Sequence, residues 1–138
     1  MSLNIKEKYG LLINNEWVPA SDGAEFAVYN PANGDQLAIC AEATQADVDK
    51  AVEVATEAFK TWKHVSQVDR ADYLLKIADA IDAHKEHLAQ VETYDNGKPI
   101  RETLNVDIPL GADHFRYFAG VLRAEEGSAQ VFDENTLS

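Results

Sequence analysis

The spacing of apolar residues changes near residue 44, where a strand-like pattern gives way to a helix-like one. Before this point, short apolar runs alternate with turn-forming residues. Residues 11–13 and 16–18 flank Asn14 and Asn15, and Asn tolerates the left-handed backbone angles of a tight hairpin turn. The pattern therefore predicts a hairpin over residues 11–18, preceded by a loose or short helical leader at residues 1–10.

A second hairpin is predicted over residues 26–40. Its arms are residues 26–29 and 36–40, and their connection contains Asn33-Gly34, a strong hairpin signal. Cys40, the single cysteine, ends the second apolar run. A lone cysteine excludes an internal disulfide, and no neighbouring Ser, His or Lys would activate the thiol. We therefore interpret it as a buried structural residue.

The first predicted helix begins after Thr44. Thr44 and Asp47 have the layout of a capping box, in which a hydroxyl and a carboxylate satisfy the free N–H groups of the first turn. The apolar residues that follow recur at three- and four-residue steps, which indicates one apolar face. Its members are Val48, Ala51, Val52, Ala55, Ala58, Phe59 and Trp62.

Ser66 and Asp69 repeat the capping signature and open what the pattern predicts to be one long helix. It should end near Gly97, because glycine readily takes the left-handed position after a helix and Pro99 forbids continuation. Lys98 is expected to complement the negative helix end.

A third helical region follows Pro99, and Asp107-Ile108-Pro109 predicts a restart because proline is favoured at an early helical position. Gly111 and Gly120 within it are interpreted as permitting close helix packing. Residues 125–127 close this helix, and the tail at 128–138 is mostly polar, with no convincing partner of its own.

Amino-acid composition narrows the classes of partner that the protein can bind. Lys and Arg number 12 against 24 Asp and Glu, giving a net charge of −12, so phosphate backbones and anionic lipids would be repelled. We therefore expect neither a nucleic-acid nor a membrane partner. No apolar run approaches a membrane span and the N-terminus lacks a signal-peptide pattern, so a cytoplasmic location is expected.

No catalytic or phosphate-binding motif stands out. The glycine-rich dinucleotide and P-loop patterns are both missing from the sequence. His84 and His87 have a spacing that metal ligands sometimes show, but Lys85 and Glu86 between them indicate a solvent-facing stretch. On residue chemistry alone the chain is a soluble α+β domain.

Six ordered blocks resemble the N-terminal part of the NAD(P)-dependent aldehyde dehydrogenase family, over about residues 9–127. Asn15 stands where glycine is usual in the family's "INGEW" pattern, and Asn33 replaces the Thr of "NPATG". Residues 100–109 lean towards bacterial members that act on acetaldehyde and similar small aldehydes. The blocks are residues 12–17, residues 29–34, residues 46–62, residues 66–78, residues 92–99 with a "GKP" ending, and residues 114–120, similar to "RYYAG".

The resemblance implies an α/β fold, with two N-terminal hairpins and three amphipathic helices from the outside of the cofactor-binding domain. Family members oxidise aldehydes to acids with NAD or NADP, using a Cys nucleophile, an oxyanion-binding Asn and a Glu base. None of these positions corresponds to a residue here. The chain alone is therefore predicted to be inactive and to hold no cofactor, with an aldehyde as substrate only of the full-length enzyme.

By the same resemblance, residues 11–127 belong to the dinucleotide-binding domain and residues 128–138 begin a bridging arm between subunits. We therefore expect a homo-oligomer, or self-association of the chain through uncovered apolar faces. Some members hold a monovalent cation at positions corresponding to Val28, Tyr29 and Asp95. The alternative for Asp95 is an ordinary carboxylate at a helix end.

Two other hypotheses compete with an incomplete dehydrogenase. The chain could be a non-catalytic interaction or structural module derived from the same family, which closes its own core and binds a partner. It could instead be a small enzyme that uses His84, His87 and nearby acids.

Overall fold

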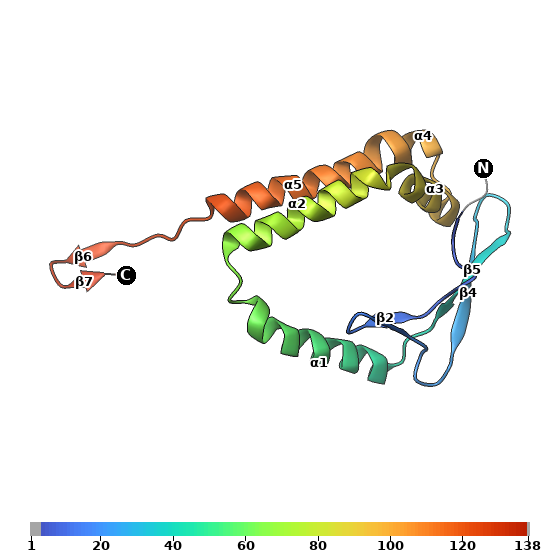
Figure 1. Ribbon diagram of the computed structural model, residues 1–138, viewed down its shortest axis with the longest axis horizontal. Helices are drawn as coiled ribbons and strands as arrows, with labels where there is room; N and C mark the ends of the chain where they lie inside the picture. Colours follow the sequence, from blue (N-terminus) through green and yellow to red (C-terminus); the bar gives the residue numbers. More distant parts are fainter. Residues whose placement is uncertain (1–3, 138) are drawn as a thin grey trace.

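The computed structural model describes residues 4–137 and shows a mixed α/β arrangement of short strands and long helices (Figure 1). Helix α1 lies apart from the paired helices α2 and α5, and the strands join the two at one end. Among residues 4–137, none of the helices has the length and hydrophobicity that crossing a membrane requires. The elements are β1 Lys8–Tyr9, β2 Leu11–Ile13, β3 Glu16–Val18, β4 Glu25–Tyr29, β5 Gln36–Ala41, α1 Gln45–Trp62, α2 Gln67–Ala83, α3 Lys85–Asn96, α4 Ile100–Glu102, the π-helical turn η1 Thr103–Asp107, α5 Ile108–Ala124, β6 Val131–Asp133 and β7 Thr136–Leu137.

Both predicted hairpins are confirmed. In the first, β2 pairs antiparallel with β3, and Asn14 and Asn15 have φ angles of 53° and 66°. Two consecutive left-handed residues are the signature of the hairpin turn that matches strand twist. In the second, β4 pairs antiparallel with β5 across a longer connection, where only Gly34 is left-handed, with a φ of 78°.

The leader is expected to be loose or a short helix; residues 4–7 have no regular structure, whereas Lys8 and Tyr9 form strand β1, which the prediction does not include. This strand pairs in parallel with β5, opposite Ile39 and Cys40, and gives a sheet of order β1-β5-β4. The pairing is non-local and only two residues long, so no periodic pattern in the sequence predicts it. Residues 1–3 of the predicted leader lie outside the described residues.

The capping box of α1 is confirmed and also ties the helix to the loop after β3. The Asp47 carboxylate accepts from the Thr44 N–H at 2.9 Å and from the Ser21 N–H at 3.1 Å. These hydrogen bonds hold the pKa of Asp47 below its ordinary value, because each favours the charged carboxylate. The bond from the Thr44 N–H has the largest effect and the bond from the Ser21 N–H the next largest. The first helix therefore starts in a fixed orientation.

The single long helix predicted from Ser66 to Gly97 is wrong in one respect, because it is interrupted at His84. The Ser66 cap and the Gly97 end, with a φ of 80°, are both confirmed. His84 takes φ −111° and ψ 16°, and its N–H is shared between the Ala80 and Ile81 carbonyls. Neither proline nor glycine marks the position, so sequence pattern cannot locate the break.

The predicted restart at Asp107–Pro109 is confirmed in that α5 begins at Ile108 with Pro109 in its first turn, but the chain before it is helical as well. The helical path begins at Ile100 and runs through the wide turn η1 directly into α5, where the Ile108 N–H donates to the Thr103 carbonyl five residues back. A regular α-helix would set the Asn105 carbonyl against the ring of Pro109, which has no N–H to offer. The π-helical turn lies directly before this proline, where it relieves that clash.

Helices α2 and α5 pack through alanine. Ala71 and Ala78 of α2 and Ala112 of α5 are fully buried, and Ala119 is 2% exposed. Small side chains at the contact let the two backbones approach closely. At the rim, Arg116 of α5 donates to Asp79 at 2.9 Å and to Asp82 at 2.7 Å, both on α2. These hydrogen bonds raise the pKa of Arg116, with Asp82 the larger cause.

Large apolar side chains are missing from the core of the described chain. The buried apolar residues there are all alanines, and the largest fully buried residue is Thr103. The predicted close packing at Gly111 and Gly120 is wrong, since a Cβ at either would meet no atom within 4 Å. The tail does find a partner in itself, because β6 and β7 pair as a small hairpin that stands away from the helices (Figure 1).

Replacing Ala78 by leucine should destabilise the chain. The fully buried position has no room for a longer side chain, and overpacking costs about 1–3 kcal/mol. Urea denaturation followed by circular dichroism at 222 nm would measure the loss in the free energy of unfolding. Ala83→Leu makes the same change at an exposed position of α2 and should be nearly neutral; equal midpoints for the two variants would contradict close α2–α5 packing.

Candidate functional site

The candidate site lies where the turn of the second hairpin meets the end of α3. Gly97, with its left-handed φ of 80°, comes so close to the hairpin that an added Cβ would lie 2.9 Å from Cγ of Pro31. An L residue would therefore be strained twice at this position, by its backbone angle and by the contact. The hairpin turn and the helix end are thus fitted to each other.

The turn is organised by Asn30, which is 8% exposed. Its side-chain Oδ1 accepts from the Ala32 N–H at 2.9 Å, an Asx turn. Its backbone N–H donates to the Asp35 carbonyl at 2.8 Å, and its carbonyl accepts from the Gly34 N–H at 2.8 Å. The loop that carries Pro31 is therefore locally rigid.

On the helical side, Thr103 joins α3 to η1. Its buried hydroxyl lies 3.0 Å from the Ala89 carbonyl, 3.2 Å from the Ile100 carbonyl and 2.9 Å from the Thr93 hydroxyl. A hydroxyl donates once and accepts twice, so donation to a carbonyl leaves a lone pair for Thr93. This one side chain therefore links η1 to polar groups of α3 and α4 in an otherwise alanine-lined interior.

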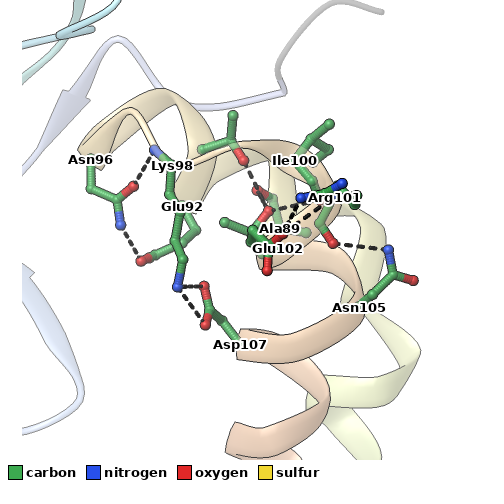
Figure 2. A network of polar contacts seen from close by, with 11 residues as sticks. Ala89, Glu92, Asn96, Lys98, Ile100, Arg101, Glu102, Asn105 and Asp107 are labelled. Carbon is green, nitrogen blue, oxygen red and sulfur yellow. Dashed lines mark hydrogen bonds and ion pairs between the residues drawn. The ribbon is translucent and has the colours of Figure 1, made fainter.

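The residues between α3 and α4 form a polar network on the outside of the same junction (Figure 2). The Asn96 side chain accepts from the Lys98 N–H at 2.7 Å and donates to Glu92. Lys98, expected to complement the helix end, places its Nζ 2.5 Å from the Asp107 carboxylate at the end of η1. Exposed ion pairs contribute little to stability, so this pair mainly orients the connection.

Two of the three predicted cation ligands meet at this junction. Val28 of β4 and Asp95 of α3 line the same cavity of about 140 Å³, whereas Tyr29 does not line it. Tyr9, Cys40 and Val91 also contribute to the wall. The Cys40 thiol is half-buried rather than fully buried, and within residues 4–137 the Asp95 carboxylate makes no side-chain hydrogen bond.

The aldehyde dehydrogenase family model matches residues 17–138, which is most of the sequence. The chain belongs to the aldehyde dehydrogenase family. It is 47% identical over 136 residues to an acetaldehyde dehydrogenase of Pseudomonas aeruginosa and 44% identical to a probable aldehyde dehydrogenase of Streptomyces coelicolor. Each match covers 99% of this chain and 27% of the relative, so the chain spans about a quarter of these relatives, in their N-terminal portion.

Solved aldehyde dehydrogenases share the backbone arrangement. A putative aldehyde dehydrogenase from Burkholderia cenocepacia superimposes with a TM-score of 0.91 and 40% identity, over 96% of this chain and 27% of that one. The NAD+ complex of an aldehyde dehydrogenase from Bacillus cereus gives a TM-score of 0.91 and 39% identity, over 98% of this chain and 28% of that one. The separation of α1 from the α2/α5 pair is therefore that of the solved family members.

Two helix N-termini of the described residues, those of α1 and α2, are poor sites for the phosphates of a dinucleotide. Phosphates bind at free helix N-termini, but here the first turns of α1 and α2 are capped by the hydroxyls of Thr44 and Ser66, with the carboxylates of Asp47 and Asp69 bonded beside them. A phosphate would meet negative charge and occupied N–H groups at both. We therefore derive no catalytic step through NAD from these residues.

The histidine pair does not form a metal centre. His84 and His87 are exposed at the break between α2 and α3, beside a shallow apolar hollow that includes Ile77 and Ile81. The part of the chain that the structure describes holds no group of three His, Cys, Asp or Glu residues arranged around a common point. The geometry gives the small-enzyme hypothesis no support.

Sequence reasoning missed one contact and one residue that build the junction. Gly97 was predicted as a helix end, but its contact with Pro31 joins segments 66 positions apart. Thr103 had no signal at all, because a single threonine in a helical segment looks like a surface residue.

Gly97→Ala should lower stability by about 1–2 kcal/mol from the left-handed backbone alone, with the Pro31 contact adding to it. Thermal unfolding would measure the change. Gly120→Ala is the matched control: it lies in the interior of α5 with no neighbour near a Cβ, so it should stabilise by about 0.5–1 kcal/mol.

Pro31→Ala, combined with Gly97→Ala, separates the two causes. The double variant should recover the steric part of the loss and retain the backbone part. A double variant that is no more stable than Gly97→Ala alone would contradict the fitted contact between hairpin and helix end.

Proposed function

We propose that this chain is the N-terminal scaffold segment of an NAD(P)+-dependent aldehyde dehydrogenase that oxidises small aldehydes to carboxylic acids. The observation that carries the proposal is its 47% identity, over 99% of its length, to the Pseudomonas aeruginosa acetaldehyde dehydrogenase. Identity of this size across a whole segment supports a shared role in a similar enzyme.

A scaffold role fits the chemistry of the described residues. Carboxylates among them form the capping box of α1 and exposed ion pairs, and their histidines lie exposed in the turn between α1 and α2, at the break before α3 or on the surface of α5. Catalysis would need a buried nucleophile with a base beside it, or a pair of carboxylates with separated pKa values. The chain by itself is therefore proposed to be inactive and to hold no dinucleotide.

The proposal extends to assembly and location. The hairpin of β6 and β7 stands away from the helices with Val131 and Phe132 well exposed, which supports its role as the start of an arm that bridges subunits. Residues 11–127 are the part proposed to belong to the dinucleotide-binding domain. The assembled enzyme is proposed to be a cytoplasmic homo-oligomer, and the isolated chain to self-associate through its uncovered apolar faces.

A hybrid enzyme tests this function. Residues 1–138 would replace the matching first quarter of the Pseudomonas aeruginosa relative, and NAD+ reduction with acetaldehyde would be followed at 340 nm. Because the catalytic part stays intact, we expect activity within about tenfold of the parent, a factor that corresponds to only about 1.4 kcal/mol in the barrier.

The separate 138-residue chain is the control and should give no turnover. A folded, soluble hybrid without activity would contradict the scaffold role. Turnover by the purified 138-residue chain alone would contradict its proposed inactivity.

We further propose that the Val28 and Tyr29 carbonyls and the Asp95 carboxylate hold a monovalent cation. Val28 and Asp95 on one small cavity support this, since carbonyl and carboxylate oxygens suit such ions. A bound ion stabilises the folded state, so the hybrid should unfold at a higher temperature in potassium chloride than in choline chloride at equal ionic strength. Asp95→Asn should remove the difference; an unchanged potassium response would contradict the site.

A further inference from the structure

The N-terminal strap, residues 5–9, closes one side of the cavity that Asp95 lines. Ile5 and Tyr9 of the strap belong to the cavity wall. The other wall residues come from β4, β5 and α3. The cavity is therefore bounded on one side by the strap and elsewhere by the sheet and a helix.

The strap is paired with the sheet over a very short length. Its strand β1 pairs with β5 over two residues, Lys8 and Tyr9, whereas β4 pairs with β5 along all five of its residues. The Ile39 N–H also donates to the Glu7 carbonyl, at 3.0 Å. Parallel pairing is slightly less stable per residue than antiparallel pairing, so the strap is held to β5 more weakly than β4 is.

Side chains attach the strap to two neighbouring strands. The Tyr9 ring packs edge-on against the Trp17 ring of β3, with the centroids 6.4 Å apart, and the Lys6 ammonium lies 5.1 Å from the centre of the Trp17 ring. The Lys8 ammonium lies 2.5 Å from the Glu25 carboxylate of β4. Trp17 is 57% exposed and the Lys8 side chain 61% exposed, so water weakens both attachments.

A weakly held terminal segment can separate from a sheet while the rest of the fold stays intact. Local openings have free energies that range from near zero at such ends to the full free energy of unfolding in the core. The remaining cavity wall depends on the five-residue pairing of β4 with β5 and on the junction at Gly97, neither of which involves the strap. Separation of the strap would therefore uncover Cys40 and Asp95 without unfolding the rest of the chain.

We propose that the strap is a lid over this cavity, and that its opening sets how fast small ions and molecules from solution reach Cys40 and Asp95. The inference goes beyond the proposed cation site, because it holds whether or not that site binds potassium. It adds a controlled entrance to a cavity that the fold alone leaves without one.

Cys40 provides the measurement, because it is the single cysteine of the 138-residue chain and lines the cavity. Its thiolate attacks the aromatic disulfide DTNB, forms a mixed disulfide and releases a coloured thiolate that is followed at 412 nm. DTNB is larger than the closed cavity of about 140 Å³, so at low reagent concentration the rate is proportional to the fraction of molecules with an open strap. The chain in urea gives the rate for a fully accessible thiol.

The two tryptophans of the chain provide a matched pair of variants. Trp17→Ala removes the ring partner of the strap but leaves the cavity wall unchanged, because Trp17 does not line it, and loss of the aromatic pair should raise the Cys40 rate by about three- to tenfold. Trp62→Ala removes a similar ring contact, with Tyr73 of α2 at 5.3 Å, and should leave the rate within about twofold because the site is distant.

Two lysines provide a second pair that leaves every ring in place. Lys6→Ala removes the ammonium over the Trp17 ring and should raise the Cys40 rate by about two- to fivefold. Lys76→Ala removes a comparable ammonium, 5.3 Å from the Tyr73 ring, and should leave the rate unchanged. Loss of positive charge alone would slow the negatively charged reagent, so a faster reaction of Lys6→Ala reports the opening of the strap.

The urea midpoint of each variant is measured beside its Cys40 rate. Faster labelling in Trp17→Ala and Lys6→Ala, but not in Trp62→Ala and Lys76→Ala, supports the lid. An unchanged rate in Trp17→Ala at an unchanged midpoint overturns it, and so does a parent chain whose thiol reacts as fast as in urea. Equal acceleration in both tryptophan variants with lowered midpoints shows that access needs global unfolding, which also overturns it. If Trp17→Ala does not fold, equal rates for the two lysine variants overturn the lid.

Discussion

The close approach of α2 and α5 through four alanines determines the character of the whole segment. Small residues bring two backbones together but bury little apolar area, and the gain in free energy scales with that area. The larger apolar side chains of the same helices therefore lie at the edge of the contact or outside it. A core of this kind fixes the geometry of the helices without covering their hydrophobic surface.

The second fixed point is the junction of the hairpin turn with the end of α3. Gly97 lets Pro31 approach, and the buried Thr103 hydroxyl lies within hydrogen-bond distance of the Ala89 carbonyl of α3 and the Ile100 carbonyl of α4. Each depends on the other, because a displaced helix end would also move the turn. The junction places Val28 and Asp95 on one cavity, although they belong to different elements.

Sequence reasoning succeeded where the signal was local. Asn14-Asn15, the Thr44 and Ser66 caps and Gly97 each fix a backbone conformation within a few residues, and each prediction is confirmed. Asn15 is left-handed, which explains why an Asn can stand where the family pattern has glycine. The break at His84, the parallel strand β1 and the continuous path through Pro109 depend on distant contacts or on small backbone adjustments that residue type does not encode.

The candidate site also combines features that local sequence predicts with features that depend on distant contacts. Local patterns could identify Asp95 as a helix-end carboxylate, but only the fold brings it to the wall that Val28 shares. The uncovered faces extend this argument, since periodicity reveals an amphipathic helix but not which of its faces will be covered. For α5 the side opposite α2 is also apolar, so Leu110, Tyr117 and Val121 remain in contact with water. The stability of such a segment therefore does not depend on its own contacts alone. The locally encoded features, which are the hairpin turn, the helix caps and the Gly97 helix end, are those that form without contacts to any further chain.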